Sequence, residues 1–360
     1  MHAADFHLDT AFDSLPDALA AQRRDEQRAV LKALVRLAKD TGVQVVLLPG
    51  DLFDGGRATP ETIEAVEQTL KALEVPVFIS PGNHDFSRAG CVYDKMYLPE
   101  NVHVFRRNVI ECMEVPDLDL RVWGGAFTDS TCPNLLRGFS MEKSPDTVDI
   151  LCIHGTVTRD GPYNPMSLED MGASGMDYVA LGHPHTCGGL QKAGDTYYLW
   201  PGVPMGRGFD ETGTKGVVIA DIESGNVTAK FAPMKGREYR VLTVDITGQD
   251  PLAALEEALP ESTGRDIYRI ILTGEAEEMP EPATIHRVLS PRFYWLEVRS
   301  EVTVHQDVWT RAGEATLRGA FLRKLKVQLD AASPAERQKI EAAARWGIAA
   351  LDGGEEAVRL

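Results

Sequence analysis

Positive charge is scarce in this chain of 360 residues, which has 37 lysines and arginines against 54 aspartates and glutamates and a formal net charge of −17. Proteins that bind nucleic acid or membranes through their overall electrostatic field depend on Lys and Arg, because these side chains displace counterions from phosphate groups. The composition therefore argues against binding through the field of the whole protein. It leaves room for a local site at which metal ions supply the positive charge.

Cysteines and long apolar runs are also scarce. The five cysteines are widely spaced and include no Cys-x-x-Cys pair, which argues against a disulfide framework and favours a reducing cytoplasm. No run approaches the roughly 18 apolar residues of a membrane span, and the first residues lack a basic region followed by an apolar one. We expect a cytoplasmic protein without a membrane-spanning segment, built from two or three domains at roughly 150 residues each.

The first 236 residues alternate apolar runs with amphipathic segments, the pattern of an α/β fold whose strands are covered by helices. The run 43–49 (VQVVLLP) is nearly all apolar, as expected of a strand buried on both faces. Apolar residues recur at helical spacing before it, over 24–39, and after it, over 61–73. Further strands are predicted at 77–79, 102–105, 121–123, 149–153, 178–181, 196–200 and 216–221. The short connections between the later strands favour a mixed sheet or a two-sheet sandwich.

Two smaller parts follow. Residues 237–305 predict a βαβαβ unit, with strands at 239–246, 268–273 and 293–298 and helices at 251–259 and 283–289. Residues 313–360 predict C-terminal helices, because apolar residues recur every four positions from Leu317 to Leu329 and Ser333–Glu336 has the pattern of a capping box. Between 313 and 346 there are seven Lys or Arg and four Asp or Glu, so this segment is locally basic.

Five short motifs follow the ends of apolar runs and contain five of the nine histidines. They are Asp5-Phe6-His7, Gly50-Asp51-Leu52-Phe53-Asp54, Gly82-Asn83-His84-Asp85, His154-Gly155 and Gly182-His183-Pro184-His185. Strand ends converge on one edge of the sheet in α/β proteins, so we expect these residues to meet in space. Any one of these histidines alone would be interpreted as a core or surface residue. Their joint occurrence indicates a metal site.

The ligand chemistry predicts two metal ions. Imidazole, carboxylate and amide donors together suit Mn, Fe or Zn. The donors are too many for one ion, and they fit two ions that share a bridging carboxylate about 3.5 to 4 Å apart. Such a pair binds a phosphate ester and lowers the pKa of a water molecule that attacks it. The glycines beside these residues, Gly50, Gly82, Gly155 and Gly182, are expected to let the backbone turn sharply.

The five motifs in this order resemble the signature of the calcineurin-like metallophosphoesterase superfamily: D-x-H, G-D, G-N-H-D/E, a lone His and G-H-x-H. Within it the chain looks most like the SbcD-type DNA repair exonucleases, through residues 2–9, Gly50–Asp54, Trp200–Gly202 and Gly206–Gly213. The resemblance implies a two-sheet sandwich flanked by helices over 1–236 and a capping domain over 237–305. It also implies that the C-terminal helices of 313–360 dock a coiled-coil ATPase.

The resemblance also assigns roles to residues. One ion would take Asp5, His7, Asp51 and His185, and the other Asp51, Asn83, His154 and His183, with Asp51 bridging. His84 would contact the scissile phosphate or protonate the leaving oxygen. We expect Arg207 to contact phosphate and Asp54 to orient a metal ligand without binding the metal itself. Archaeal and eukaryotic relatives often have a histidine at the position of Asp54, and the strand expected before Asp5 is either short or begins upstream of Met1.

The leading hypothesis is therefore a metal-dependent phosphodiesterase of the SbcD type. It would act on DNA as an exonuclease or endonuclease in DNA repair, with two divalent ions, most simply Mn²⁺ and otherwise Fe or Zn. Its partners would be DNA, an SbcC-like coiled-coil ATPase and a second copy of the chain. Two alternatives remain open: a phosphoesterase for a small phosphodiester or phosphomonoester, and a non-catalytic scaffold of the same fold.

Overall fold

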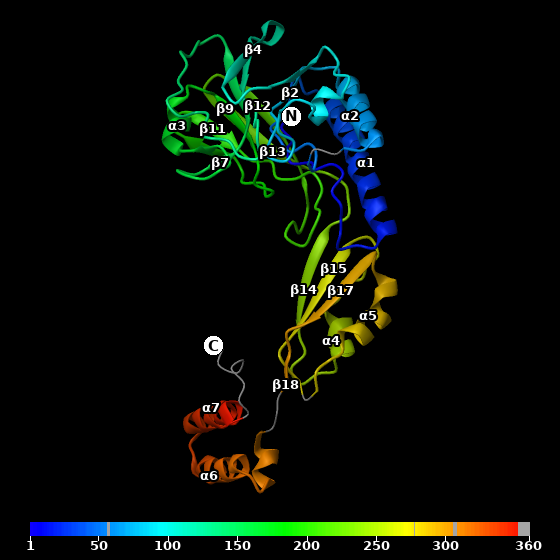
Figure 1. Ribbon diagram of the computed structural model, residues 1–360, viewed down its shortest axis with the longest axis vertical. Coiled ribbons are helices and arrows are strands. Elements are labelled where there is room, and N and C mark those ends of the chain that lie inside the picture. The colour runs from blue at the N-terminus through cyan, green and yellow to red at the C-terminus, as the bar shows by residue number, and fades with distance from the viewer. Residues whose placement is uncertain (56–57, 277, 305–307, 352–360) are drawn as a thin grey trace. The chain divides into compact units, whose positions relative to one another are not determined.

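The computed structural model describes residues 1–55, 58–276, 278–304 and 308–351 (Figure 1). The chain divides into two compact units. The first consists of Met1–Val241, Ser262–Arg269 and Ser290–Leu296, and the second of Leu242–Glu261, Ile270–Leu289 and Glu297–Leu360. Of the predicted segment 313–360, the structure describes residues 313–351. Of the predicted segment 237–305, it describes every residue except 277 and 305.

The first sheet of the first unit combines parallel strands with a hairpin. The parallel strands are β1 (Val46–Leu48), β2 (Val77–Ile79) and β3 (Val102–Val104), and the antiparallel hairpin is β12 (Gly216–Glu223) with β13 (Asn226–Pro233). His2 joins the two groups, because it bridges Leu47 in parallel and Val218 in antiparallel orientation. The strand expected before Asp5 is thus reduced to a short bridging segment in this structure.

The second sheet has six strands in the order β10-β11-β9-β6-β5-β4. They are β4 (Glu111–Val115), β5 (Leu120–Gly124), β6 (Val148–His154), β9 (Tyr178–Gly182), β10 (Gln191–Ala193) and β11 (Thr196–Leu199). The four inner strands are parallel, and the edge strands β4 and β10 are antiparallel to their neighbours. A separate short pair consists of β7 (Thr156–Val157) and β8 (Pro165–Met166). The predicted mixed α/β architecture is confirmed.

The two sheets share a core, and helices cover their other faces. Leu47 of the first sheet lies in one buried cluster with Ile150 and Tyr178 of the second. Val46 and Leu48 belong instead to a cluster with the helices α1 (Asp17–Thr41) and α2 (Pro60–Leu73). Side chains alternate across a strand, so the continuous apolar run 43–49 serves both clusters. On the second sheet, Met171 of α3 (Leu168–Ala173) packs with residues of β6 and β9.

The helix ends explain the observed boundaries. α2 begins where predicted, because the Thr59 hydroxyl accepts a hydrogen bond from the Thr62 N–H and Pro60 occupies the first turn. α1 ends at Gly42, which has the left-handed conformation (φ 64°) typical of a helix C-terminus. However, α1 begins at Asp17, well before the predicted residue 24. Its first turns bury only Ala20 and Arg23 before position 24, so the apolar periodicity there is weak.

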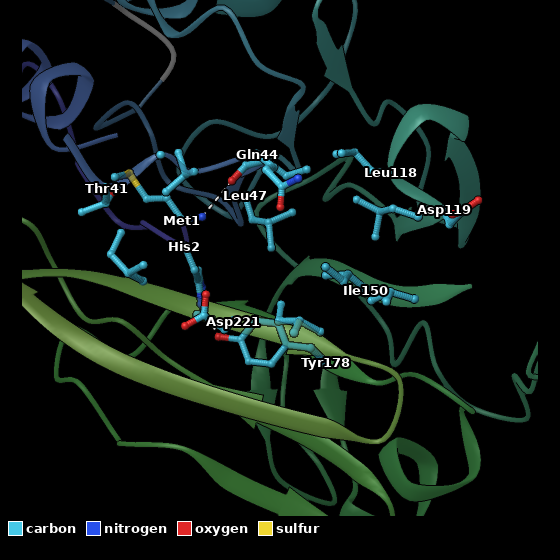
Figure 2. A pocket seen from close by; sticks show the side chains of 18 of the residues that line it. Met1, His2, Thr41, Gln44, Leu47, Leu118, Asp119, Ile150, Tyr178 and Asp221 are labelled. Carbon is cyan, nitrogen blue, oxygen red and sulfur yellow. Dashed lines mark hydrogen bonds between the residues drawn. The ribbon is translucent and has the colours of Figure 1, made fainter. Parts of the chain in front are cut away.

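A cavity of about 350 Å³ lies at the beginning of the strands (Figure 2). Met1, Gln44, Asp119, Tyr178 and Asp221 are among its lining residues. Nδ1 of His2 lies 2.9 Å from the Tyr178 hydroxyl at this cavity. Since the motif residues follow the opposite ends of β6 and β9, the cavity is separate from the convergence point of the motifs.

The later elements follow the predicted order. They are β14 (Tyr239–Asp245), α4 (Pro251–Ala258), β15 (Ile267–Thr273), α5 (Pro282–Leu289) and β17 (Trp295–Ser300), with β16 (Glu275–Ala276) and β18 (Thr303–Val304) as a further short pair. The three longer strands form a sheet in the order β14-β15-β17. β17 starts two residues later than predicted, and a 3₁₀ turn over Ser290–Arg292 precedes it.

The chain continues into the helices α6 (Leu317–Ala331) and α7 (Pro334–Leu351). Val308, Leu322, Ala344 and Ile348 form their shared core. The Glu336 carboxylate accepts a hydrogen bond from the Ser333 N–H at 3.0 Å, as the capping box predicts. Among the described residues, no helix has both the length and the apolar character that crossing a membrane requires.

Candidate metal centre

The motif residues gather at the carboxyl ends of strands from both sheets. Gly50–Asp54 follows β1, Gly82–Asp85 follows β2, His154 ends β6, and His183 follows β9. The segment after His2 runs beside the first of these loops, since the Asp5 N–H donates to the Gly50 carbonyl at 3.1 Å and the His7 N–H to the Asp51 carbonyl at 2.9 Å. The expected convergence of the five motifs is therefore present in the structure.

Left-handed backbone conformations concentrate at this point. Asp5 (φ 55°), His7 (φ 43°), Asp51 (φ 49°) and His183 (φ 107°) are all non-glycine residues with positive φ. Each such conformation costs of order 1–3 kcal/mol and persists only where the surrounding structure enforces it. Four of them within one cluster of motif residues favour a functional role for the cluster.

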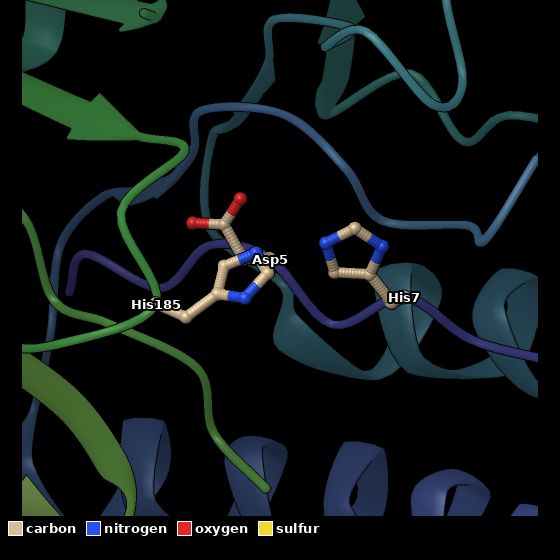
Figure 3. Close-up of side chains that lie close together, drawn as sticks. All are labelled: Asp5, His7 and His185. Carbon is tan, nitrogen blue, oxygen red and sulfur yellow. The ribbon is translucent and has the colours of Figure 1, made fainter. Parts of the chain in front are cut away.

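Asp5, His7 and His185 form the first cluster (Figure 3). One potential ligand atom from each lies within 4.8 Å of the others. Asp5 is fully buried, and its carboxylate accepts a hydrogen bond from the His183 N–H at 3.0 Å. Burial raises the pKa of Asp5 well above its usual range, and the nearby Asp51 carboxylate raises it further. A cation at this cluster would offset both effects.

Asp51, His154 and His183 form the second cluster under the same criterion. The Asn83 amide oxygen belongs with it, at 2.9 Å from Nε2 of His154 and 3.2 Å from Nδ1 of His183. Oδ2 of Asp51 lies 3.5 Å from Nε2 of His154 and 3.6 Å from Nε2 of His7, which belongs to the first cluster. The Asp51 carboxylate thus lies between the two clusters.

The donor set fits a pair of divalent cations. Nε2 of His7 is buried and has no hydrogen-bond partner among the described residues, although it faces a carboxylate. Burial lowers the pKa of His7 and of His183 to about 4, so both imidazoles are neutral near pH 7, as metal ligands must be. Burial would raise the pKa of Asp51, but positive charge beside it holds that pKa below its usual range; protonated His154 and His7 supply this charge, and a bound cation would supply it when they are neutral. Neutral imidazoles around an ionised carboxylate are the donors that Mn, Fe or Zn prefers.

Residues 1–187, just over half of the chain, match the Calcineurin-like phosphoesterase family. The chain belongs to this family. Its candidate metal sites are the His/Asp clusters described above, and the chain is a metal-dependent phosphoesterase by family. The implied superfamily resemblance is thereby confirmed at the level of the family.

Three relatives of this phosphoesterase show how distant the finer resemblance is. The uncharacterized metallophosphoesterase YhaO of Bacillus subtilis is 26% identical over 297 residues, which cover 77% of this chain and 72% of the relative. The DNA double-strand break repair protein Mre11 of Saccharolobus solfataricus is 24% identical over 297 residues, 76% of this chain and 75% of the relative. One subunit of the nuclease SbcCD of Staphylococcus saprophyticus is 24% identical over 273 residues, 65% of this chain and 68% of the relative.

His84 lies at the edge of the phosphoesterase site. Its side chain is 43% exposed, and Nδ1 lies 3.1 Å from Oδ1 of Asp54. The same carboxylate oxygen lies 3.3 Å from Nδ1 of His7. The hydrogen bond with Asp54 raises the pKa of His84 above its usual range. Asp54 therefore orients both a predicted ligand and the predicted catalytic histidine, and one potential ligand atom from each of these three residues lies within 4.8 Å of the others.

The glycines of the site are required partly for a reason other than the expected one. Gly50 has φ 91°, which fits the expected sharp turn. Gly82 and Gly182 lack a positive φ; there the constraint is space, because a Cβ would overlap the Asp51 carboxylate at Gly82 and the Pro49 carbonyl at Gly182. At these two positions glycine lets the ligand loops approach closely.

Two further carboxylates lie near the site: Asp85, which belongs to the third motif but was given no defined role there, and Glu211, for which the sequence predicted no role. Asp85 is buried and accepts hydrogen bonds from the Leu52 and Gly82 N–H groups, each at 2.8 Å, so it joins two of the ligand loops. Glu211 is buried against His185 and Arg207. Burial would raise the pKa of Glu211, but the hydrogen bonds from His185 and Arg207 hold it at about 2. The available signal was an acidic residue inside the glycine-rich segment 206–213.

Proposed function

We propose that this chain is a phosphodiesterase that cleaves DNA as a nuclease with two Mn²⁺ ions. The observation that carries the proposal is the position of Asp51, whose Oδ2 lies within 3.6 Å of imidazole nitrogens from both clusters. One ion would take Asp5, His7, Asp51 and His185, and the other Asp51, Asn83, His154 and His183.

In this proposal the metal ions, His84 and Asp85 have separate roles. Two divalent cations bound there would withdraw negative charge from the oxygens of the phosphodiester. They would also lower the pKa of a water molecule, so that this water could attack phosphorus near neutral pH. His84, exposed and held by Asp54, would donate a hydrogen bond or a proton to the departing oxygen. Asp85 keeps the loops of Asp51 and Asn83 at a fixed separation, because its carboxylate accepts hydrogen bonds from backbone N–H groups of both loops.

The choice of DNA as substrate draws on the relatives. One is named a DNA double-strand break repair protein and another a subunit of a nuclease. The net charge of −17 fits a subunit that holds DNA weakly on its own and depends on its metal ions and a partner for binding.

The C-terminal helices are the proposed docking segment for a coiled-coil ATPase. Leu317 and Val327 of α6 are 73% and 71% exposed, and Trp346 of α7 is 45% exposed. Large apolar side chains at this exposure are available to pack against a partner helix. A second copy of the chain is a further proposed partner.

The test compares three substrates under one condition. Purified full-length chain with Mn²⁺ is incubated with end-labelled linear duplex DNA, single-stranded DNA and bis-p-nitrophenyl phosphate, beside a D51A control prepared identically. Nucleotide release from DNA that is lost in the control supports the proposal. Fast hydrolysis of the small ester with intact DNA would replace it with a small-substrate phosphoesterase, and no bound metal and no activity would indicate a scaffold.

A further inference from the structure

Glu211 is an acidic residue that touches the metal centre only through another side chain. Its side chain is 3% exposed, and Oε1 lies 2.8 Å from Nδ1 of His185. His185 is the member of the first cluster contributed by the loop after β9. Glu211 therefore contacts the imidazole on the side opposite to the one that a metal ion would use, provided that the ion binds at Nε2.

The orientation of the His185 ring agrees with that provision. In Figure 3 one ring nitrogen of His185 lies on the side of Asp5 and the other is turned away from it. The nitrogen turned away from Asp5 is bonded to the ring carbon that carries the side chain, so it is Nδ1, the nitrogen beside Glu211, and the nitrogen on the side of Asp5 is Nε2. The ring is thus held with Nε2 directed toward the cluster.

The Glu211 carboxylate is fully engaged by donors. Oε1 accepts from Nη2 of Arg207 at 2.6 Å in addition to His185, and Oε2 accepts from the Arg207 N–H at 2.8 Å. Nη2 of Arg207 also lies 3.1 Å from Nδ1 of His185. A guanidinium only donates, so Nδ1 of His185 either accepts from Arg207 or donates to Glu211. Its approach to 2.8 Å from a carboxylate oxygen favours donation, because two atoms that only accept would repel each other at that distance. With the proton on Nδ1, in a hydrogen bond to Glu211, Nε2 carries the free lone pair that a metal ligand needs.

The loop that carries Glu211 is anchored at both ends. Nη2 of the buried Arg23 donates to the Gly206 carbonyl at 2.8 Å, and the Gly213 N–H donates to the Tyr239 carbonyl at 3.1 Å. The Arg23 guanidinium lies over the rings of Phe12 and Tyr239 at 5.5 and 5.7 Å from their centres. The carboxylate is therefore held in place by groups outside the metal centre.

We propose that Glu211 is a positioning residue: it accepts a hydrogen bond from Nδ1–H of His185, with Arg207 holding the carboxylate, and so fixes the tautomer and ring orientation that present Nε2 to one of the two metal ions. The inference rests on the proposed two-metal function. It assigns Arg207 a role through Glu211, beside the phosphate contact predicted from the sequence.

The experiment measures metal binding without substrate. Full-length wild type, E211Q, E211A and the control D149N are stripped with chelator and dialysed against a series of Mn²⁺ concentrations, and bound Mn²⁺ per chain is measured by elemental analysis. D149N is the matched control, because Asp149 is also a buried carboxylate that accepts hydrogen bonds from an arginine, Arg121, but it contacts no predicted ligand and none of the groups that anchor the Glu211 loop. Thermal unfolding of each metal-free protein is recorded in parallel.

We expect one of the two sites in E211A to weaken about 10- to 100-fold, the usual effect of losing the partner of a metal-bound histidine. E211Q should weaken the same site less, because its amide oxygen still accepts the Nδ1 proton. The other site and the D149N protein should match wild type.

Either of two results would overturn the inference and leave the proposed function standing. One is wild-type affinity at both sites in both variants. The other is equal weakening of both sites, which indicates a general structural role. If E211A does not fold, E211Q decides by the same criteria. Wild type that binds fewer than two ions would instead contradict the proposed function and the inference with it.

Discussion

Nε2 of His7 lies 3.6 Å from Oδ2 of Asp51, and no hydrogen bond reaches this buried nitrogen within the described ranges of the chain. Leaving a buried polar atom unsatisfied costs about 1–3 kcal/mol. A cation between the two atoms would remove this cost and would also balance the buried carboxylates of Asp5 and Asp51.

Metal binding should stabilise the folded protein. A ligand that binds only the folded state at 100 times its Kd adds about 2.7 kcal/mol for one site, so saturating Mn²⁺ should raise the melting temperature and chelator should reverse the rise. Differential scanning calorimetry with and without Mn²⁺ checks this. An unchanged melting temperature in saturating Mn²⁺ would show that the clusters do not bind the ion.

Asp51→Ala should empty both sites, because the carboxylate lies between the two clusters. Elemental analysis after dialysis against Mn²⁺ measures the loss. Asp129→Ala is a suitable control, since Asp129 is exposed and its carboxylate bonds the neighbouring Ser130. One ion retained in the Asp51 variant would mean that this carboxylate serves a single site.

His84→Gln should keep both ions and lose most of the rate. The loss of a general acid typically costs about 10²- to 10⁴-fold, and His84 is 43% exposed at the edge of the clusters. Nucleotide release from linear duplex DNA, whose departing alkoxide needs a proton, and metal content are measured on the same preparation. Loss of metal from this variant would make His84 a structural residue of the site.

Gly182→Ala should destabilise the fold, because the new Cβ would overlap the Pro49 carbonyl and lie 2.8 Å from Nδ1 of His154. Overpacking of this kind costs about 1–3 kcal/mol. Gly236→Ala is the matched control, since a Cβ there meets nothing within 4 Å. Urea unfolding gives both free energies, and equal values for the two variants would contradict the close approach of these loops.

Much of the architecture follows from apolar patterns alone. β2 has the predicted bounds, 77–79, because three consecutive buried residues mark a strand that is covered on both faces. β4, β10 and β13 were not predicted: they are largely exposed, so their sequences lack the continuous apolar runs that identify the inner strands. Strands that are exposed on one face cannot be identified from continuous apolar runs.

The local sequence predicted the meeting of the motif residues in the candidate site, but it did not predict the contacts that depend on distant parts of the chain. The five motifs follow strand ends, and strand ends of an α/β fold meet at one edge, so the meeting of Asp5 with His185 could be expected. The contact of Glu211 with His185 could not, since it depends on how the loop 206–213 is anchored by Arg23 far earlier in the chain. The sequence near Glu211 does not indicate that Arg23 packs against this loop.

The electron paramagnetic resonance spectrum of the Mn²⁺-loaded protein tests the central claim most directly. Two Mn²⁺ ions that share the Asp51 carboxylate, about 3.5 to 4 Å apart, should give the spectrum of an exchange-coupled pair at full loading, and Asp51→Ala should abolish it. A six-line spectrum of isolated Mn²⁺ at full loading would contradict a two-metal centre bridged by Asp51.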